Sequence, residues 1–238
     1  MSLSTTQIEE LKFHFGEILK NCEGEFEKGC GSYMFDGKTY LFDEKLLPKQ
    51  NLLYEKTLNK NKALEIGTYM GHSLLLMLIA NPKIEVTTID IEKKYAEPSV
   101  NYLKKSFPHA KIEFIHGNSL KILPKLNEKY DFFHIDGLHK NKTIIKEFNY
   151  CKKLYSGDTL EIVFDDIINC EDLKKSIFST FKVRNYIYGE CWSKNMYASI
   201  EFPKENKKKF TLNCIFFIKN LTKYVLLKIN RLRSFKKL

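Results

Sequence analysis

From residue 63 onward, short apolar runs alternate with longer segments in which apolar residues recur every three or four positions. The short runs predict strands at 63–66, 84–89, 111–115, 130–135 and 159–164, and the periodic segments predict helices at 71–79, 95–106, 119–126, 140–154 and 170–181. This alternation is typical of an α/β protein whose parallel sheet is covered by helices on both faces. Two further strand-like runs, 183–191 and 197–202, follow without a helix between them. The pattern therefore predicts a doubly wound, mostly parallel seven-stranded sheet that ends in an antiparallel hairpin.

The first 60 residues are expected to form a helical cap. Residues 5–20 place Ile8, Leu11, Phe15, Ile18 and Leu19 on one helical face, and Thr6 and Glu9 have the spacing of a capping box. A short strand around 40–42 and a helix from about 48 to 58 follow. The predicted organisation is a helical cap at 1–60, a ligand-binding domain at 61–203 and a basic tail at 204–238.

The first predicted strand of the domain leads into a glycine-containing turn, Glu65-Ile-Gly67-Thr-Tyr-Met-Gly71-His-Ser73. Glycine allows a tight turn and a close backbone approach to a ligand, and the amides that open the next helix favour an anionic group. The second strand ends at Asp90, which is suited to bind a ribose diol. Because Tyr69 stands where the middle glycine of a dinucleotide motif would be, a nucleoside without a diphosphate fits better than NAD.

This turn resembles the first motif of class I S-adenosylmethionine-dependent methyltransferases. It is most similar to that of the metal-dependent O-methyltransferases of the catechol and caffeoyl-CoA type and the related sugar O-methyltransferases. The resemblance implies a Rossmann-like fold that binds S-adenosylmethionine. The implied cofactor contacts are Glu65, Gly67, Thr68, Tyr69, Gly71 and Ser73 in the turn, Asp90 at the ribose, Asn118 and Ser119 beside the adenine, and Asp136. The alternative is an ordinary strand–turn–helix joint of another Rossmann-like protein.

Three aspartates follow neighbouring strands: Asp136 after the fourth, and Asp165 and Asp166 after the fifth. Carboxylates brought together at adjacent strand ends repel one another unless a cation or a shared proton compensates. A divalent ion, with magnesium expected, explains the cluster, and the same positions hold the metal ligands in the resembling family. A single aspartate at a strand end is more often the N-cap of the next helix. The alternative role of Asp165 or Asp166 is therefore to cap the segment that follows the strand.

His139 lies three residues after Asp136, where catechol-type enzymes place a lysine. A histidine of near-neutral pKa suits the removal of a proton from a metal-bound hydroxyl, so His139 and Asp136 are the candidate catalytic residues. A helix-start histidine that hydrogen-bonds the loop is an equal alternative. Lys140 is a second candidate base, and His134 is expected to be structural.

Charge is concentrated at the end of the chain. Residues 204–238 hold eleven Lys or Arg and one acid, which accounts for the whole net charge of +10. The rest of the chain is neutral, and the whole chain has only three arginines, which argues against a nucleic-acid partner. The tail is predicted to be a basic amphipathic helix that binds an anionic membrane surface or a partner protein in preference to packing on its own domain. Six scattered cysteines and the absence of a signal peptide indicate a cytoplasmic protein, peripheral on a membrane if the tail binds one.

The sequence thus predicts an S-adenosylmethionine-dependent, Mg-assisted O-methyltransferase that acts on a small hydroxylated molecule or a sugar. One alternative is a metal-free methyltransferase acting on nitrogen or on nucleic acid. Another is a non-catalytic Rossmann-like binding module. The oligomeric state is left open, a dimer included.

Overall fold

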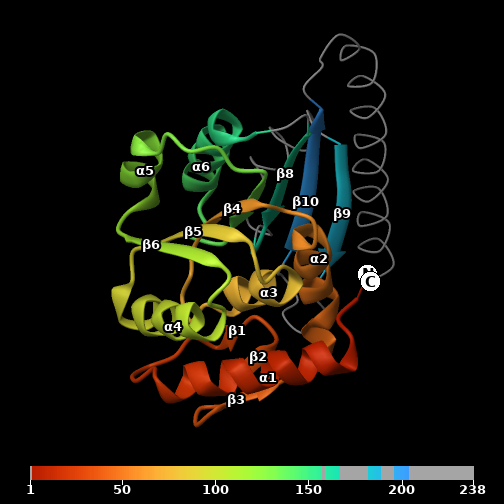
Figure 1. Cartoon of the computed structure of the whole chain (residues 1–238), viewed down its shortest axis with the longest axis vertical. Helices are drawn as coiled ribbons and strands as arrows, with labels where there is room; N and C mark the ends of the chain where they lie inside the picture. The colour runs from red at the N-terminus through yellow and green to blue at the C-terminus, as the bar shows by residue number, and fades with distance from the viewer. Residues whose placement is uncertain (1, 157–158, 167–181, 189–195, 204–238) are drawn as a thin grey trace, which may run out of the picture.

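The computed structural model describes residues 2–156, 159–166, 182–188 and 196–203 (Figure 1). Two predicted elements, the helix at 170–181 and the basic tail at 204–238, lie outside these residues. Among the helices that are described, none is long and apolar enough to cross a membrane.

The main sheet has the strand order β6-β5-β4-β7-β8-β10-β9. Its strands are β4 (Lys62–Ile66), β5 (Glu85–Asp90), β6 (Lys111–His116), β7 (Phe132–Ile135), β8 (Thr159–Phe164), β9 (Lys182–Tyr188) and β10 (Met196–Pro203). The strands from β6 to β8 in this order pair in parallel, and β10 pairs antiparallel with both β8 and β9. The chain order reverses between β4 and β7, so their carboxyl ends frame the crevice where such sheets bind ligands. The predicted α/β Rossmann-like class with a parallel five-stranded core is confirmed.

Helices cover both faces of this sheet (Figure 1). One face carries α2 (Leu47–Thr57), α3 (His72–Ala80) and α4 (Lys93–Ser106), and the other carries α5 (Ser119–Ile122), the 3-10 turn η2 (Leu123–Lys125) and α6 (Asn141–Leu154). Successive strand residues face opposite sides: Ala63 and Phe132 pack in the α3 core, whereas Leu64 and Phe133 pack in the α6 core. Burial on both faces explains why these strands are continuous apolar runs.

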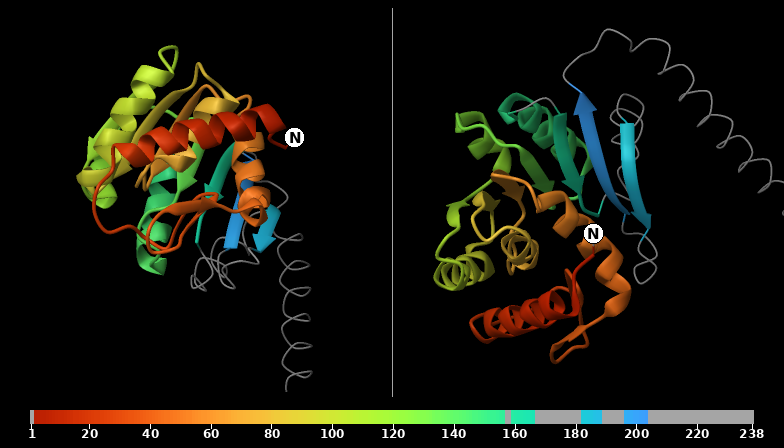
Figure 2. Two further views of the ribbon diagram at one scale, coloured as in Figure 1. Left: turned by 90° about the horizontal axis from the view of Figure 1, so that it is seen from below. Right: turned by 45° about the vertical axis from the view of Figure 1, so that its right-hand side comes forward.

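The N-terminal segment forms an outer layer (Figure 2). It contains α1 (Thr5–Lys20), a small antiparallel sheet of β1 (Gly29–Cys30), β2 (Tyr33–Phe35) and β3 (Tyr40–Phe42), and the 3-10 turn η1 (Glu44–Leu46). Leu11, Phe15 and Ile18 of α1 are buried in the same core as α3. The cap and the sheet domain therefore share one hydrophobic core.

The start of α1 differs from the prediction. The helix covers the predicted residues, but its capping box is formed by Ser4 and Gln7 and not by Thr6 and Glu9. The Ser4 side chain accepts from the amide of Gln7, and the Gln7 side chain accepts from the amide of Ser4. Both pairs have the required spacing, and the pair immediately before the first helical residue forms the cap.

Candidate active site

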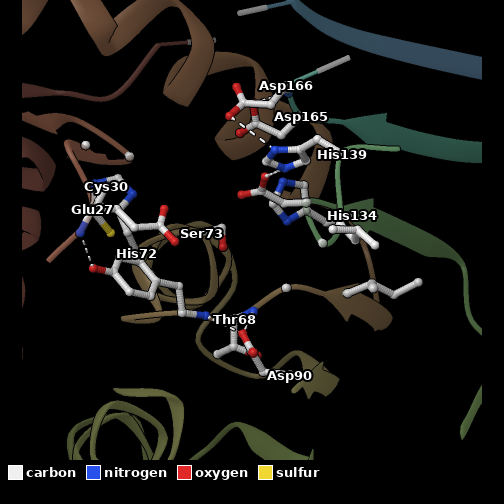
Figure 3. Close-up of a pocket in the computed structure, with 18 of the residues that line it drawn as sticks. Glu27, Cys30, Thr68, His72, Ser73, Asp90, His134, His139, Asp165 and Asp166 are labelled. Atoms are coloured by element: carbon white, nitrogen blue, oxygen red, sulfur yellow. Dashed lines mark hydrogen bonds and ion pairs between the residues drawn. The ribbon is translucent and has the colours of Figure 1, made fainter. Parts of the chain in front are cut away.

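A cavity of about 1190 Å³ lies at the carboxyl ends of the parallel strands, under the N-terminal segment. The residues following β4 and β5 line one half, and those following β7 and β8 line the other. Figure 3 shows this division: Thr68 and Asp90 lie together, Asp165, Asp166, His134 and His139 form a separate group, and Glu27, Cys30 and His72 occupy the wall opposite that group. We refer to the two halves as the turn half and the carboxylate cluster.

The turn half is built on a backbone conformation that requires glycine. Gly67 has φ +92°, and a Cβ placed on it would lie 2.1 Å from the carbonyl oxygen of Asp136. The turn is anchored to both neighbouring strand ends, because Gly67 donates to Ile89 O at 2.9 Å and Asp136 donates to Ile66 O at 2.7 Å. Gly71 (φ +72°) is the N-cap of α3. The β4 tip thus packs directly against the β7 tip, with no space for a side chain between them.

Asp90 holds the shape of this turn. Its Oδ2 accepts the amides of Thr68 and Tyr69, each at 2.7 Å, and its Oδ1 accepts the amide of Glu92 at 2.7 Å. Tyr69 has a left-handed backbone, φ +45°, which these bonds help to maintain. A carboxylate has about four acceptor positions, so these three bonds leave one position of Asp90 unused.

Glu65 departs from the prediction of a direct cofactor contact. Its side chain is fully buried and does not line the cavity. Its oxygens accept from Ser73 Oγ at 2.5 Å and Thr88 Oγ1 at 2.7 Å, and one lies 3.3 Å from His134 Nδ1. Of these two residues, Ser73 lines the cavity, and its hydrogen bond to the buried Glu65 orients it. The acid is excluded from the surface because β4 is the buried central strand.

The carboxylate cluster brings together the three predicted metal ligands and two histidines. Ligand atoms of His134, Asp136 and Asp165 lie within 4.8 Å of one another, and so do those of Asp136, His139 and Asp166. Asp166 has φ +50°, a conformation that is uncommon outside glycine. Carboxylate oxygens are the donors that Mg²⁺ and Mn²⁺ prefer, and one of them, Asp166 Oδ1, is buried without a hydrogen-bond partner. The donor set therefore fits a divalent ion.

Mutual repulsion and burial perturb the ionisation of this cluster. Burial and the charge of Asp165 raise the pKa of Asp136, and the same two causes raise the pKa of Asp166 to about 7. Burial by itself would lower the pKa of His139, but Asp136, whose Oδ1 lies 3.3 Å from His139 Nε2, and the other two aspartates raise it to about 9. At neutral pH the cluster therefore keeps a proton on His139.

Lys49, near the start of α2, was not predicted to belong to this site. Its ammonium forms an ion pair with Asp165 Oδ2 and lies 3.9 Å from Asp166 Oδ1. Burial would raise the pKa of Asp165, but the charge and hydrogen bond of Lys49 lower it overall. Lys49 thus stabilises the charged form of one of the three aspartates.

Comparisons with known proteins agree with this geometry. Residues 64–167 match the family described as a methyltransferase domain. This match covers under half of the chain and agrees with the predicted resemblance to class I S-adenosylmethionine-dependent methyltransferases. Caffeoyl-CoA O-methyltransferase of Medicago sativa is 33% identical over 106 residues, 42% of this chain and 41% of that protein. An Arabidopsis thaliana protein provisionally named for the same enzyme is 39% identical over 79 residues, 32% of this chain and 34% of that protein. The chain thus spans well under half the length of these relatives.

Solved structures share the fold at low sequence identity. An O-methyltransferase of Bacillus cereus, solved with S-adenosylhomocysteine, is 15% identical with a TM-score of 0.53, covering 83% of this chain and 91% of that one. The O-methyltransferase TomG of Streptomyces achromogenes, solved with S-adenosylmethionine, is 18% identical with a TM-score of 0.52, covering 65% and 79%. At these identities the likeness concerns the fold.

Asn118 and Ser119 lie on the cavity wall, at the start of α5. Asn118 is the N-cap, since its side chain accepts from Leu120 N at 2.9 Å. Ser119 does not cap the helix; its hydroxyl donates to Glu147 Oε1 at 2.6 Å. Glu147 is fully buried on α6, and burial raises its pKa. The cap thus lies one residue before the predicted helix at 119–126, and nothing in the sequence indicated the partnership of Ser119 with Glu147.

Three tyrosines tie the N-terminal segment to the turn half. Tyr69 Oη accepts the amide of Glu27 at 3.0 Å, and Tyr40 Oη donates to Glu27 O at 2.9 Å. Tyr95 Oη donates to Glu25 O at 2.5 Å, and the rings of Tyr69 and Tyr95 meet edge to face with centroids 5.2 Å apart. We call Tyr40, Tyr69 and Tyr95 the tyrosine clasp. The clasp holds residues 25–27 against the turn half of the cavity.

Proposed function

We propose that the protein is an O-methyltransferase that transfers a methyl group from S-adenosylmethionine to a hydroxyl of a small molecule, with a divalent ion, Mg²⁺ expected, held by Asp136, Asp165 and Asp166. One observation carries the proposal: a single cavity joins a glycine turn suited to a nucleoside with a cluster of oxygen donors suited to a hard cation. The acceptor class, a small hydroxylated molecule or a sugar, rests on the sequence resemblance.

The ion, when bound, would acidify and orient the acceptor hydroxyl. The residues of the chain contribute position and proton handling. Gly67 and Asp90 fix the turn that holds the nucleoside, and Ser73 presents a hydroxyl to the cavity. His139, at the mouth of the carboxylate cluster with a 42% exposed side chain, is the proposed base. Positive charge placed among the same aspartates lowers its pKa from about 9, which frees the imidazole to accept a proton near neutral pH.

Two experiments test the proposal. Calorimetry should detect S-adenosylhomocysteine binding and no NAD binding. A labelled-methyl assay over a panel of hydroxylated aromatic and sugar acceptors should give product with Mg²⁺, and EDTA should suppress it. Full activity in EDTA would favour the metal-free alternative, and cofactor binding without turnover on any hydroxyl acceptor would favour a binding module.

The basic tail is a separate part of the proposal, and it rests on sequence alone. The full-length protein should co-sediment with anionic vesicles, and Phe217→Glu should release it more completely than loss of one tail lysine, since each lysine contributes about 1 kcal/mol near the surface. Equal sedimentation with neutral and anionic vesicles would contradict a role for the charges.

A further inference from the structure

The ammonium of Lys49 is a cation that the chain itself supplies to the carboxylate cluster. The lysine comes from α2, outside the strand ends that carry the aspartates, and its side chain is 21% exposed. Its partner Asp165 is buried. Burying two charged groups costs hydration energy, which their mutual attraction must offset. Here the ammonium contacts Asp165 and also lies near Asp166.

Both oxygens of Asp165 are already engaged. Oδ2 contacts the Lys49 ammonium, and Oδ1 accepts the backbone amide of Asp166 at 2.7 Å. The amide is fixed by the chain, whereas the ammonium sits at the end of a flexible side chain. A divalent ion that binds Asp165 beside the ammonium would place two like charges on one carboxylate, and they repel strongly away from bulk water. The ammonium is therefore the partner that must move.

We propose that Lys49 is a resident counter-ion that competes with the divalent ion for Asp165, so that metal binding requires displacement of the ammonium. The proposal rests on the metal site of the proposed function. Lys49 is a positioning residue in this scheme: its ion pair holds the Asp165 carboxylate in place while no metal is bound. Because the ammonium must be displaced, the apparent affinity for metal is lower when the ion pair between Lys49 and Asp165 is stronger.

Titration calorimetry with Mn²⁺ at fixed pH and ionic strength tests the competition. Lys49→Met removes the charge and keeps an unbranched side chain, and we expect it to bind Mn²⁺ about tenfold more tightly than wild type. Lys49→Arg keeps the charge and should stay within about threefold of wild type. Lys45→Met is the matched control for the loss of one positive charge, because Lys45 is an exposed lysine that lines the same cavity. It too should stay within about threefold.

Thermal unfolding gives a second readout. Without the ammonium, Lys49→Met should melt below wild type in EDTA, and Mn²⁺ should raise its melting temperature by more than it raises that of wild type. If Lys49→Met does not fold in EDTA, Lys49→Gln, which retains a donor without a charge, takes its place.

Each outcome decides the proposal. Tighter Mn²⁺ binding by Lys49→Met but not by Lys45→Met supports it, as does Mn²⁺ binding by Lys49→Met when wild type binds none. Unchanged or weaker binding in Lys49→Met overturns it, and so does the absence of Mn²⁺ binding in both proteins. S-adenosylhomocysteine titrated into the same samples separates the two proposals, since its failure to bind wild type would overturn the proposed function, whereas unaltered metal affinity would overturn only the role of Lys49.

Discussion

Asp90 in the turn half of the cavity accepts three backbone amides, and Glu65, buried beside that half, accepts two hydroxyl groups. Asp166 in the carboxylate cluster, in contrast, has an oxygen buried without a hydrogen-bond partner. The pKa values of Asp136 and Asp166 are raised. The same type of side chain therefore has two roles within one cavity. Acids that the chain satisfies fix its conformation, and acids that it leaves poorly satisfied are available to a ligand.

The largest expected effect comes from a substitution in the turn half, Gly67→Ala. Gly67→Ala would combine backbone strain at φ +92° with overlap of its Cβ and the Asp136 carbonyl, and each cause costs about 1–3 kcal/mol of unfolding free energy. We expect S-adenosylhomocysteine binding to fall below detection by calorimetry.

Gly37→Ala is the matched control for this substitution, because Gly37 has φ +100° but nothing within 4 Å of an added Cβ. It should cost the strain alone, about 1–3 kcal/mol, and leave cofactor affinity unchanged. Equal loss of affinity in both variants would mean that the effect is general destabilisation and not the turn.

The second prediction contrasts one acid from each half. Glu65→Gln breaks charge-assisted bonds to buried partners and should lower the unfolding free energy by about 2 kcal/mol. Asp166→Asn removes a carboxylate whose charged form burial and Asp165 disfavour, so in EDTA at pH 8 it should raise the melting temperature by a few degrees. Thermal unfolding of both variants measures the contrast. Destabilisation by both would show that the carboxylate cluster is as well satisfied as the turn half.

The pattern of the sequence was sufficient to predict the elements that carry these acids. The predicted strand at 159–164 coincides with β8, and the helix predicted at 140–154 is α6, which begins one residue later. A short, mostly apolar run defines the strand locally, and apolar residues recurring every three or four positions define the helix. Boundaries shifted where a single contact decided them: β7 begins at Phe132, not at residue 130, because Tyr130 forms an isolated bridge with Tyr155.

The partners of the site residues were not predictable in the same way. The pairing of Lys49 with Asp165 joins residues far apart in the chain, and a single lysine carries little signal in a sequence with 39 lysines and arginines. Whether Glu65 lines the cavity or lies beneath it depends on which residues α3 brings over it, here Ser73. The order of the strands and the placement of the helices determine both the Lys49–Asp165 pairing and the position of Glu65. Neither of these tertiary features produces a local pattern in the sequence.

The third prediction concerns pH. In EDTA the imidazole of His139 should titrate with a pKa near 9, and Asp136→Asn should lower that pKa toward its ordinary value of about 6.5, because the neighbouring carboxylate favours the protonated ring. A native pKa above the unfolded one stabilises the protein below pH about 6.5, and this contribution is lost as the pH rises through about 9. An NMR titration of the histidine ring protons measures the pKa directly. An unshifted value in Asp136→Asn would assign the perturbation to other groups.

The smallest expected effect belongs to the tyrosine clasp, which closes the turn half without touching the carboxylate cluster. Tyr69→Phe removes the acceptor for the Glu27 amide, and one such hydrogen bond contributes about 0.5–1.5 kcal/mol. If residues 25–27 must lift for the cofactor to leave, S-adenosylhomocysteine should dissociate up to about tenfold faster, as measured by stopped-flow, with Mn²⁺ affinity unchanged. Tyr102→Phe is the matched control, since it loses a tyrosine hydroxyl that contacts His14 Nδ1 at 2.8 Å outside the cavity. Dissociation that is equally fast in both variants would show that the clasp does not limit cofactor release.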